Sequence, residues 1–221
     1  MPPLASSPSL SSLSSSTGYA GVEVVAYGGG NVGSVLRALE RLGIAYTVCQ
    51  QGSELTGTLP LVLPGVGAFG ALMQALEARG HKARLLELLQ AGQVPFLGIC
   101  VGLQVLFEGS EESPEAQGLG WFKGHVRQLQ GAKVPQIGWN EVRPQAPHEA
   151  WPQGYVYYVN SYVAHPQVLA ANEGLVLYES TYEGQSFCGA VRQGLVTAFQ
   201  FHPEKSGAFG HALLAQWWAS C

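Results

Sequence analysis

The chain has 221 residues, of which 47% are apolar and only 12% are charged, and its formal net charge is −4. This length suits one hydrophobic core rather than two. The low negative charge, without any run of Lys or Arg, argues against a surface that binds nucleic acid or an anionic membrane. No apolar run reaches the roughly 18 residues of a membrane-spanning helix.

The first 18 residues are rich in serine and proline and contain no charged side chain. A secretory signal would combine a basic start with an unbroken apolar stretch, and a transit peptide would be rich in arginine. Neither pattern is present. We therefore expect a disordered tail at residues 1–18 and one folded domain at residues 19–221.

In the first half of the folded part, strand-like and helix-like segments alternate. The predicted strands are residues 22–27, 45–49, 61–63 and 94–99. The predicted helices are residues 31–42, 69–79, 82–90 and 101–107. This alternation predicts a largely parallel sheet with helices on its faces.

After Gly118 the pattern changes to strands joined by short polar turns. The predicted strands are residues 155–163, 175–179, 187–192 and 195–201. A last helix at 209–218 would pack through its apolar residues, which are Leu213, Leu214, Trp217 and Trp218. We predict a single α/β domain with a central, mostly parallel sheet flanked by helices and extended by antiparallel strands in its second half.

The strongest local feature is the segment Gly98–Gln104, in which a buried strand ends at Cys100 and a helix follows at once. Such an elbow presents a nucleophile at the carboxyl edge of an open sheet, where α/β folds bind ligands. Gly98 and Gly102 permit the tight turn, and the helix N-terminus favours a thiolate. The alternative is a buried cysteine that packs as a small apolar side chain.

A cysteine nucleophile needs a base, and the base needs an orienting group. In extended backbone His202 and Glu204 project to the same side, and Pro203 keeps His202 out of the helical region. Glu204 would fix the imidazole tautomer and stabilise the imidazolium. Taken alone, such a pair is more often a solvated His and Glu at a strand end, but the elbow upstream favours catalysis.

Acyl transfer also needs donors for an oxyanion. The segment Pro64–Gly67 follows the third predicted strand, so it should lie at the same sheet edge as Cys100. The backbone N–H groups of Val66, Gly67 and Val101 are the candidate donors. A plain Pro-Gly turn is the alternative.

The segment Gly28–Gly33 fits the G-x-G-x-x-G pattern of dinucleotide sites. That pattern expects an acidic residue about 20 positions further on, whereas the second predicted strand ends in Val48–Gln51 without one. We interpret the glycines as a tight connection and expect no cofactor.

Cysteine and histidine spacing argues against disulfides and metals. The four cysteines, Cys49, Cys100, Cys188 and Cys221, are far apart and form no C-x-x-C pair, which predicts reduced thiols in a cytoplasmic protein. The six histidines form no H-x-H or H-E-x-x-H cluster, so no metal site is expected.

Together these residues resemble the class I glutamine amidotransferases over nearly all of residues 22–218. The signatures G-x-C-x-G-x-Q and His-Pro-Glu, shared by that class, stand at residues 98–104 and 202–204. Within the class, the chain is similar to the glutaminase subunits of imidazole glycerol phosphate synthases. The stretches that carry the narrower resemblance are residues 27–31, 64–70, 98–112, 133–142, 157–162 and 199–207.

The resemblance implies that Cys100 is the nucleophile, His202 the acid/base and Glu204 its partner in the hydrolysis of glutamine to glutamate and ammonia. The implied glutamine-binding residues are Gly65, Gly67, Gln104, Glu112 and, through their backbone, Ser161 and Tyr162. A carboxylate at Glu112 could pair with the α-ammonium group of the substrate. In the family, the Pro64–Gly67 segment is an oxyanion strand that reorients when the partner is loaded.

The implied partner is a (β/α)8 cyclase, which forms a heterodimer with the glutaminase and receives ammonia through its barrel in histidine biosynthesis. The implied interface residues are Asn31, Trp139, Tyr157 and Lys205. Three residues depart from the family pattern, which has Asp at Ala26 and often His at Gln136 and Asn160. These departures concern the interface and the oxyanion strand rather than the three catalytic positions.

Three other functions remain open from the sequence. The chain could be a class I glutaminase that serves another synthase, although residues 110–112 and 133–142 argue against it. It could be a binding subunit that has lost turnover, which the intact Cys100, His202 and Glu204 disfavour. It could also be a stand-alone hydrolase or peptidase with a Cys-His pair.

Overall fold

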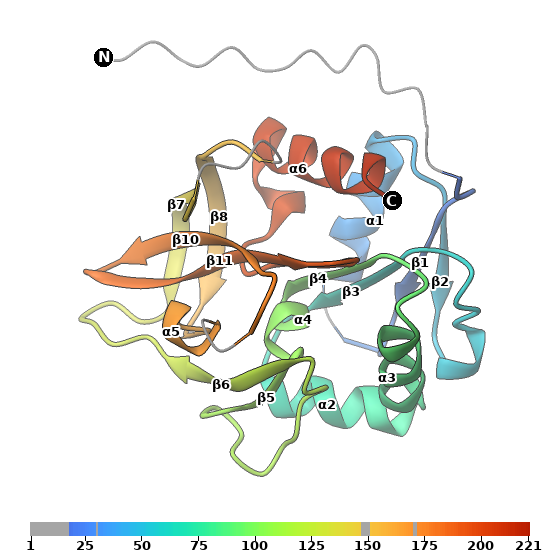
Figure 1. Ribbon diagram of the computed structural model, residues 1–221, viewed down its shortest axis with the longest axis horizontal. Coiled ribbons are helices and arrows are strands. Elements are labelled where there is room, and N and C mark those ends of the chain that lie inside the picture. The colour runs from blue at the N-terminus through green and yellow to red at the C-terminus, as the bar shows by residue number, and fades with distance from the viewer. Residues whose placement is uncertain (1–17, 30, 147–150, 170–171) are drawn as a thin grey trace.

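A nine-stranded sheet crosses the whole molecule in the computed structural model, which describes residues 18–221 apart from 30, 147–150 and 170–171 (Figure 1). In spatial order the strands are β2 (Tyr46–Cys49), β1 (Val22–Val25), β3 (Leu61–Gly65), β4 (Phe96–Cys100), β12 (Val196–Phe199), β11 (Gln185–Gln193), β10 (Val176–Tyr182), β7 (Gln136–Pro144) and β8 (Gly154–Asn160). The predicted tail lies outside the described residues except for Gly18, and so does Gly30 of the glycine-rich connection.

The sheet has a parallel half and an antiparallel half. Strands β2, β1, β3, β4 and β12 pair in parallel. Strands β11, β10, β7 and β8 continue the sheet with antiparallel pairs. The predicted architecture, a parallel sheet with antiparallel additions from the second half of the chain, is confirmed.

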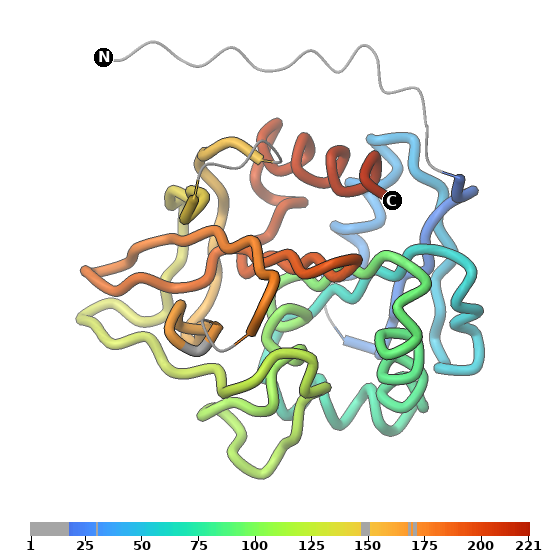
Figure 2. Tube along the Cα trace, viewed as in Figure 1, coloured from blue at the N-terminus to red at the C-terminus, as the bar shows by residue number. Residues whose placement is uncertain are grey.

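Helices cover both faces of the parallel half, which explains why β1, β3 and β4 are buried along their whole length. Helices α1 (Val32–Arg41) and α6 (Gly207–Ala219) lie on one face, and α2 (Phe69–Ala78), α3 (His81–Ala91) and α4 (Val101–Gln104) on the other (Figures 1 and 2). Trp217 of α6 is fully buried, as predicted, and Trp218 is half-buried. No helix in the described residues is long and apolar enough to cross a membrane.

A second, three-stranded sheet corrects part of the prediction. The predicted helix at 101–107 ends at Gln104, and the chain continues as β5 (Phe107–Ser110), which pairs with β6 (Phe122–Gln128). A short apolar run such as Val105–Phe107 fits a buried strand as well as a helix, and here Phe107 packs on Phe122 with ring centroids 5.4 Å apart. The predicted strand at 155–163 divides at Ser161, and its second part, β9 (Tyr162–Val163), pairs with β6.

Strands β6 and β7 were not predicted. In the first part of β7 the apolar residues do not face the core, because Ile137 and Trp139 are 64% and 56% exposed whereas Gln136 is buried; Val142 further along the strand is buried. This reverses the alternation that identifies a half-buried strand. The remaining elements are short: η1 (Gly52–Glu54), α5 (Pro166–Leu169) and η2 (Pro203–Lys205).

Two glycines bring α4 directly onto the sheet. A Cβ atom on Gly102 would overlap the carbonyl oxygen of Leu63 on β3, and one on Gly98 would overlap the carbonyl oxygen of Gly102. No side chain fits between α4 and strands β3 and β4. The turn at Cys100, which joins β4 to α4, is therefore held by backbone packing.

We expect Gly102→Ala to destabilise the fold by about 1–3 kcal/mol, because the added methyl group must push α4 away from β3. Urea unfolding followed by far-UV circular dichroism would measure the change. Gly33→Ala is the matched control, because its Cβ meets only the Arg37 guanidinium at 3.5 Å and alanine is favoured in a helix. Equal stability of the Gly102→Ala variant and the unmodified chain would contradict this role.

Candidate active site

The carboxyl ends of four parallel strands meet at one edge of the sheet. Strand β1 leads to Asn31, β3 to Gly67 and β12 to His202, while β4 ends at Cys100. The strand register places Gly65 directly opposite Cys100. This edge is where open α/β sheets bind ligands.

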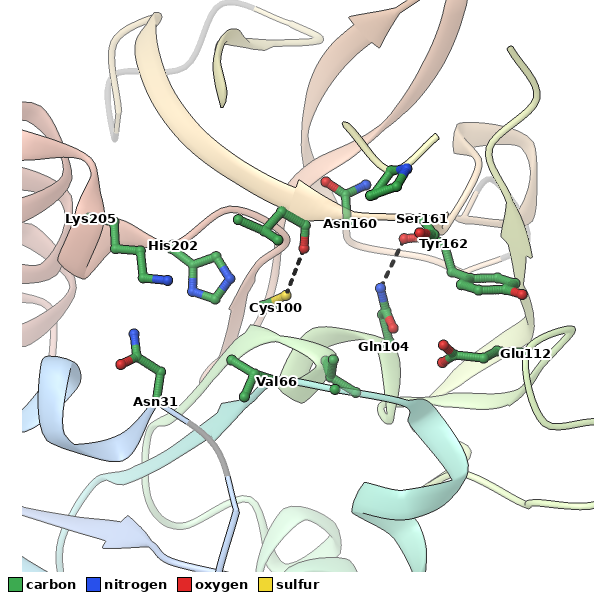
Figure 3. Close-up of a pocket in the computed structure, with 14 residues that line it drawn as sticks. Asn31, Val66, Cys100, Gln104, Glu112, Asn160, Ser161, Tyr162, His202 and Lys205 are labelled. Atoms are coloured by element: carbon green, nitrogen blue, oxygen red, sulfur yellow. Dashed lines mark hydrogen bonds between the residues drawn. The ribbon is translucent and has the colours of Figure 1, made fainter. Parts of the chain in front are cut away.

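A pocket of about 600 Å³ opens over these strand ends (Figure 3). Its lining residues are Asn31, Val66, Gly67, Cys100, Val101, Gln104, Glu112, Pro135, Val159, Asn160, Ser161, Tyr162, His202 and Lys205. Four predicted site residues lie outside this lining. Gly65 is buried at the end of β3, Glu204 lies behind His202, and Trp139 and Tyr157 lie on a separate face.

Cys100 occupies the predicted elbow, with φ 56° and ψ −110°. Positive φ is uncommon outside glycine and costs on the order of 1–3 kcal/mol, so such residues persist where the surrounding structure fixes them. The side chain is buried, and its Sγ donates to the carbonyl oxygen of Val159 at 3.9 Å. Val101 is the first residue of α4, so its N–H is free of intrahelical bonding.

His202 and Glu204 form a buried pair beside Cys100. The distance from His202 Nδ1 to Glu204 Oε1 is 2.8 Å, and their side chains are 3% and 0% exposed. The backbone of His202 is fixed on both sides, because its N–H donates to the Tyr157 carbonyl and its carbonyl accepts from the Ser206 hydroxyl. The imidazole therefore has a set position relative to the sulfur.

Asn31 also contacts this pair. Its side-chain Nδ2 donates to Glu204 Oε1 at 3.0 Å, so this one carboxylate oxygen accepts from both Asn31 and His202. Figure 3 shows Asn31 and Lys205 on the same side of the His202 ring. The sequence suggested Asn31 only as an interface residue, and its contact with Glu204 was not predicted.

The electrostatics of the pair favour an imidazolium. Burial disfavours the charged ring, but hydrogen bonding to Cys100 and Glu204 outweighs burial and raises the pKa of His202 to about 9. A protonated His202 at neutral pH is the form that a neighbouring thiolate at Cys100 would stabilise.

The Pro64–Gly67 segment lies beside Cys100, but one candidate donor already has an acceptor. The backbone N–H of Val66 donates to the hydroxyl oxygen of Tyr27 at 3.2 Å. In this conformation the Val66 N–H is therefore directed at the Tyr27 hydroxyl. Gly67, the next residue, has φ +90°, and a Cβ built there would meet nothing within 4 Å. This contact of Tyr27 was not predicted, because it joins the ends of two separate strands.

The opposite end of the pocket is polar and fixed by hydrogen bonds. Gln104 Nε2 donates to the Tyr162 carbonyl oxygen at 2.9 Å, and Glu112 Oε2 accepts the N–H of Phe69 at 2.7 Å. Phe69 begins α2, whose N-terminus favours a carboxylate. Figure 3 shows Gln104, Glu112 and Tyr162 on the other side of Cys100 from His202.

Gln136 and Asn160, two of the departures from the family pattern, are neighbours across β7 and β8. Both side chains are buried. Among the described residues, no hydrogen-bond partner faces Gln136 Oε1 or either amide atom of Asn160. Asn160 thus contributes a polar surface without a protein partner to the pocket wall.

Trp139 and Tyr157 pack against each other outside the pocket. They are paired across β7 and β8, and their rings meet edge to face with centroids 6.0 Å apart. Three more apolar or aromatic residues alternate on the same strands: Ile137, Tyr155 and Val159. We call these five residues the β7–β8 face, of which Tyr155 is the most exposed aromatic at 63%.

Comparison with protein families supports the resemblance. The family model described as glutamine amidotransferase class-I matches residues 23–220. Three curated relatives carry the name imidazole glycerol phosphate synthase subunit HisH. The protein from Deinococcus radiodurans is 45% identical over 196 residues, or 86% of this chain and 88% of that protein. The one from Thermococcus kodakarensis is 44% identical over 197 residues (87% and 96%), and one from Thermus thermophilus is 40% identical over 192 (87% and 93%).

Solved structures show the same fold at lower identity. A crystal structure of a glutamine amidotransferase matches with a TM-score of 0.72 and 21% identity, covering 90% of this chain and 99% of that one. PurLQS from Thermotoga maritima matches with a TM-score of 0.67 and 17% identity, covering 88% and 96%. At these identities the likeness concerns the fold alone.

Proposed function

This chain belongs to the class I glutamine amidotransferases, and from that premise we propose that Cys100, His202 and Glu204 hydrolyse glutamine to supply ammonia to a synthase partner. The names of the curated relatives make imidazole glycerol phosphate synthase, in histidine biosynthesis, the synthase concerned. The observation that carries the proposal is the buried His202–Glu204 pair beside the strained Cys100.

In the proposed reaction, the Cys100 thiolate attacks the side-chain carbonyl carbon of glutamine. The tetrahedral oxyanion is stabilised by the N–H of Val101 and by the oxyanion strand. Protonated His202 gives its proton to the leaving nitrogen, ammonia departs and a thioester remains. Water activated by His202 then releases glutamate and restores the thiolate.

The opposite end of the pocket suits the amino-acid part of glutamine. The Gln104 amide nitrogen has its two acceptors in the protein, so its oxygen is the atom that remains to accept from the substrate. One oxygen of Glu112 holds Phe69, and the carboxylate can pair with the substrate α-ammonium group. Backbone groups of Ser161, Tyr162 and the Gly65–Gly67 segment complete the proposed site.

We expect glutamate release to be slow from the chain alone, faster with the cyclase partner, and fastest with the partner and its nucleotide ligand. Cys100→Ser should lower glutamine hydrolysis by roughly 10⁴-fold or more, while ammonium salts still support the synthase reaction of the complex. A coupled glutamate assay and a cyclase assay would measure the two activities. Loss of both activities in a folded complex would contradict this division of labour.

The Tyr27 contact supports a proposal for the resting state of the oxyanion strand. While Val66 N–H donates to Tyr27, it does not face the substrate, so one donor of the proposed oxyanion site is withheld. Burial raises the pKa of Tyr27, which keeps the acceptor a neutral phenol. Loading of the partner would then favour the conformation in which Val66 N–H turns towards the pocket.

Tyr27→Phe removes the acceptor and should raise glutamine hydrolysis by the chain without its partner. We expect a rise of roughly tenfold in kcat, which is part of the 10²–10³ that one oxyanion donor is typically worth. Tyr46→Phe is the control, because its hydroxyl bonds Glu40 at an exposed position away from the pocket. An unchanged rate in Tyr27→Phe would show that this hydroxyl does not restrain the strand.

The β7–β8 face supports a heterodimer with the (β/α)8 cyclase. Exposed aromatic and aliphatic side chains in one cluster are typical of a protein–protein contact, and Lys205 and Asn31 lie at the neighbouring pocket mouth. The ammonia released at Cys100 would leave towards this face. All four cysteines are free thiols, in keeping with the cytoplasmic location that we propose.

Trp139→Ala should weaken binding of the cyclase by about 2 kcal/mol or more, because large aromatic anchors dominate such interfaces. Isothermal titration calorimetry with the purified cyclase would measure Kd. Leu195→Ala is the matched control, since Leu195 is also exposed, at 42%, but lies outside the β7–β8 face. Equal losses in the two variants would place the interface elsewhere.

A further inference from the structure

Gln200 joins Cys100 to the glutamine-binding end of the pocket through buried amide groups. Its side chain is fully buried, and its Nε2 donates to Cys100 Sγ at 3.8 Å. Its Oε1 accepts from Gln104 Nε2 at 3.1 Å, and the same Gln104 nitrogen donates to the Tyr162 carbonyl at 2.9 Å. The chain of contacts therefore runs from Tyr162 through Gln104 and Gln200 to the sulfur.

The Tyr162 carbonyl fixes which amide groups in this series of hydrogen bonds donate and which accept. The Tyr162 carbonyl oxygen can only accept, so the Gln104 atom that faces it must be the amide nitrogen. The second hydrogen of that nitrogen points at Gln200, whose facing atom must then be the oxygen. Gln200 is left with its amide nitrogen towards Cys100. Flipping any one amide would set two donors or two acceptors against each other.

We propose that Gln200 is a positioning residue that donates to the Cys100 sulfur and favours the thiolate, and that Gln104 orients it for this role. The proposal rests on the proposed function in taking Cys100 as the nucleophile. An N–H donor stabilises an anionic sulfur more than a neutral thiol. His202 lines the same pocket as Cys100 and would transfer a proton to the leaving nitrogen, whereas the Gln200 amide keeps its hydrogen and serves only as a donor to the sulfur.

We call this series of hydrogen bonds from Tyr162 to Cys100 the amide relay. The relay also connects the sulfur to the substrate-binding end of the pocket. Gln104 and Tyr162 line the pocket where the amino-acid part of glutamine would bind, whereas Gln200 lies behind that lining. A shift of the Tyr162 strand would rotate the Gln104 amide and so withdraw the donor from the sulfur. The charge of Cys100 would thus depend on the geometry of the substrate site.

The test uses alkylation of Cys100 by iodoacetamide, which needs no glutamine turnover. The other thiols interfere little near neutral pH, because burial raises the pKa of Cys49 to about 11 and of Cys221 to about 12, and also raises that of Cys188. Cys100→Ser gives the background rate. Peptide mass spectrometry identifies the modified residue at each pH.

We expect Gln200→Met to slow alkylation at pH 7 by roughly tenfold, as for loss of a hydrogen bond to a charged group. The alkylation rate at the alkaline plateau should stay within about twofold. The pH profile should therefore shift to higher pH, without a loss of rate at every pH. In the complex, kcat for glutamine should fall by about the same factor with KM within about twofold. An unchanged pH profile, or an equal loss at every pH, would overturn the proposal.

Two further variants keep the test informative. Gln136→Met places the same side chain at another buried glutamine, whose Oε1 has no partner among the described residues, and should keep the unmodified profile. Gln104→Met leaves Gln200 in place but unoriented, so it should move the profile in the same direction by a smaller factor. The double variant should match Gln200→Met within about twofold.

Additive effects of Gln104→Met and Gln200→Met would overturn the relay. If Gln200→Met does not fold, as judged by circular dichroism, an unmoved profile in Gln104→Met overturns it instead. Failure of the proposed function is separate, because it would appear as absent glutamate release from the unmodified complex, whereas the alkylation profiles would still differ.

Discussion

The close packing of α4 on strands β3 and β4 is the constraint on which the rest of the site depends. It leaves no room for a side chain at Gly98 or Gly102, and it forces the chain at Cys100 into positive φ. The same turn ends β4 and begins α4. The sulfur therefore lies at the sheet edge, next to the N–H groups at the start of the helix, which have no intrahelical partner. A looser contact would relieve the strain and move the sulfur away from His202.

The two halves of the sheet contribute different parts of the pocket. The parallel half supplies the strand ends that carry Cys100, His202 and the Pro64–Gly67 segment, and these ends form the usual ligand edge of an α/β sheet. The antiparallel half supplies β8, whose Tyr157 backbone bonds both His202 and Ser206. The strand that carries the outer aromatic surface is therefore bonded directly to the segment that carries the imidazole.

The local geometry of the site was predictable from the sequence, and its long-range contacts were not. The elbow at Cys100 and the His202–Glu204 spacing are set by neighbouring residues, and the structure brings all three side chains together. Strand β7 escaped prediction because Trp139 faces outwards and Gln136 inwards, against the usual alternation. The hydrogen bonds of Tyr27 and Gln200 join residues that are 39 and 100 positions apart, so no local pattern could reveal them.

Strand β8 ends the nine-stranded sheet, so its outer backbone groups have no neighbouring strand in the described chain. The bonds from Tyr157 to His202 and Ser206 cover part of that edge, but the exposed side chains of the β7–β8 face remain an apolar surface on which copies of the chain can associate. Free copies of the chain would therefore tend to self-associate as their concentration rises. If the proposed partner covers this face, matched synthesis of the two proteins would preserve solubility, and a cell that makes this chain in excess would lose it to aggregation or proteolysis.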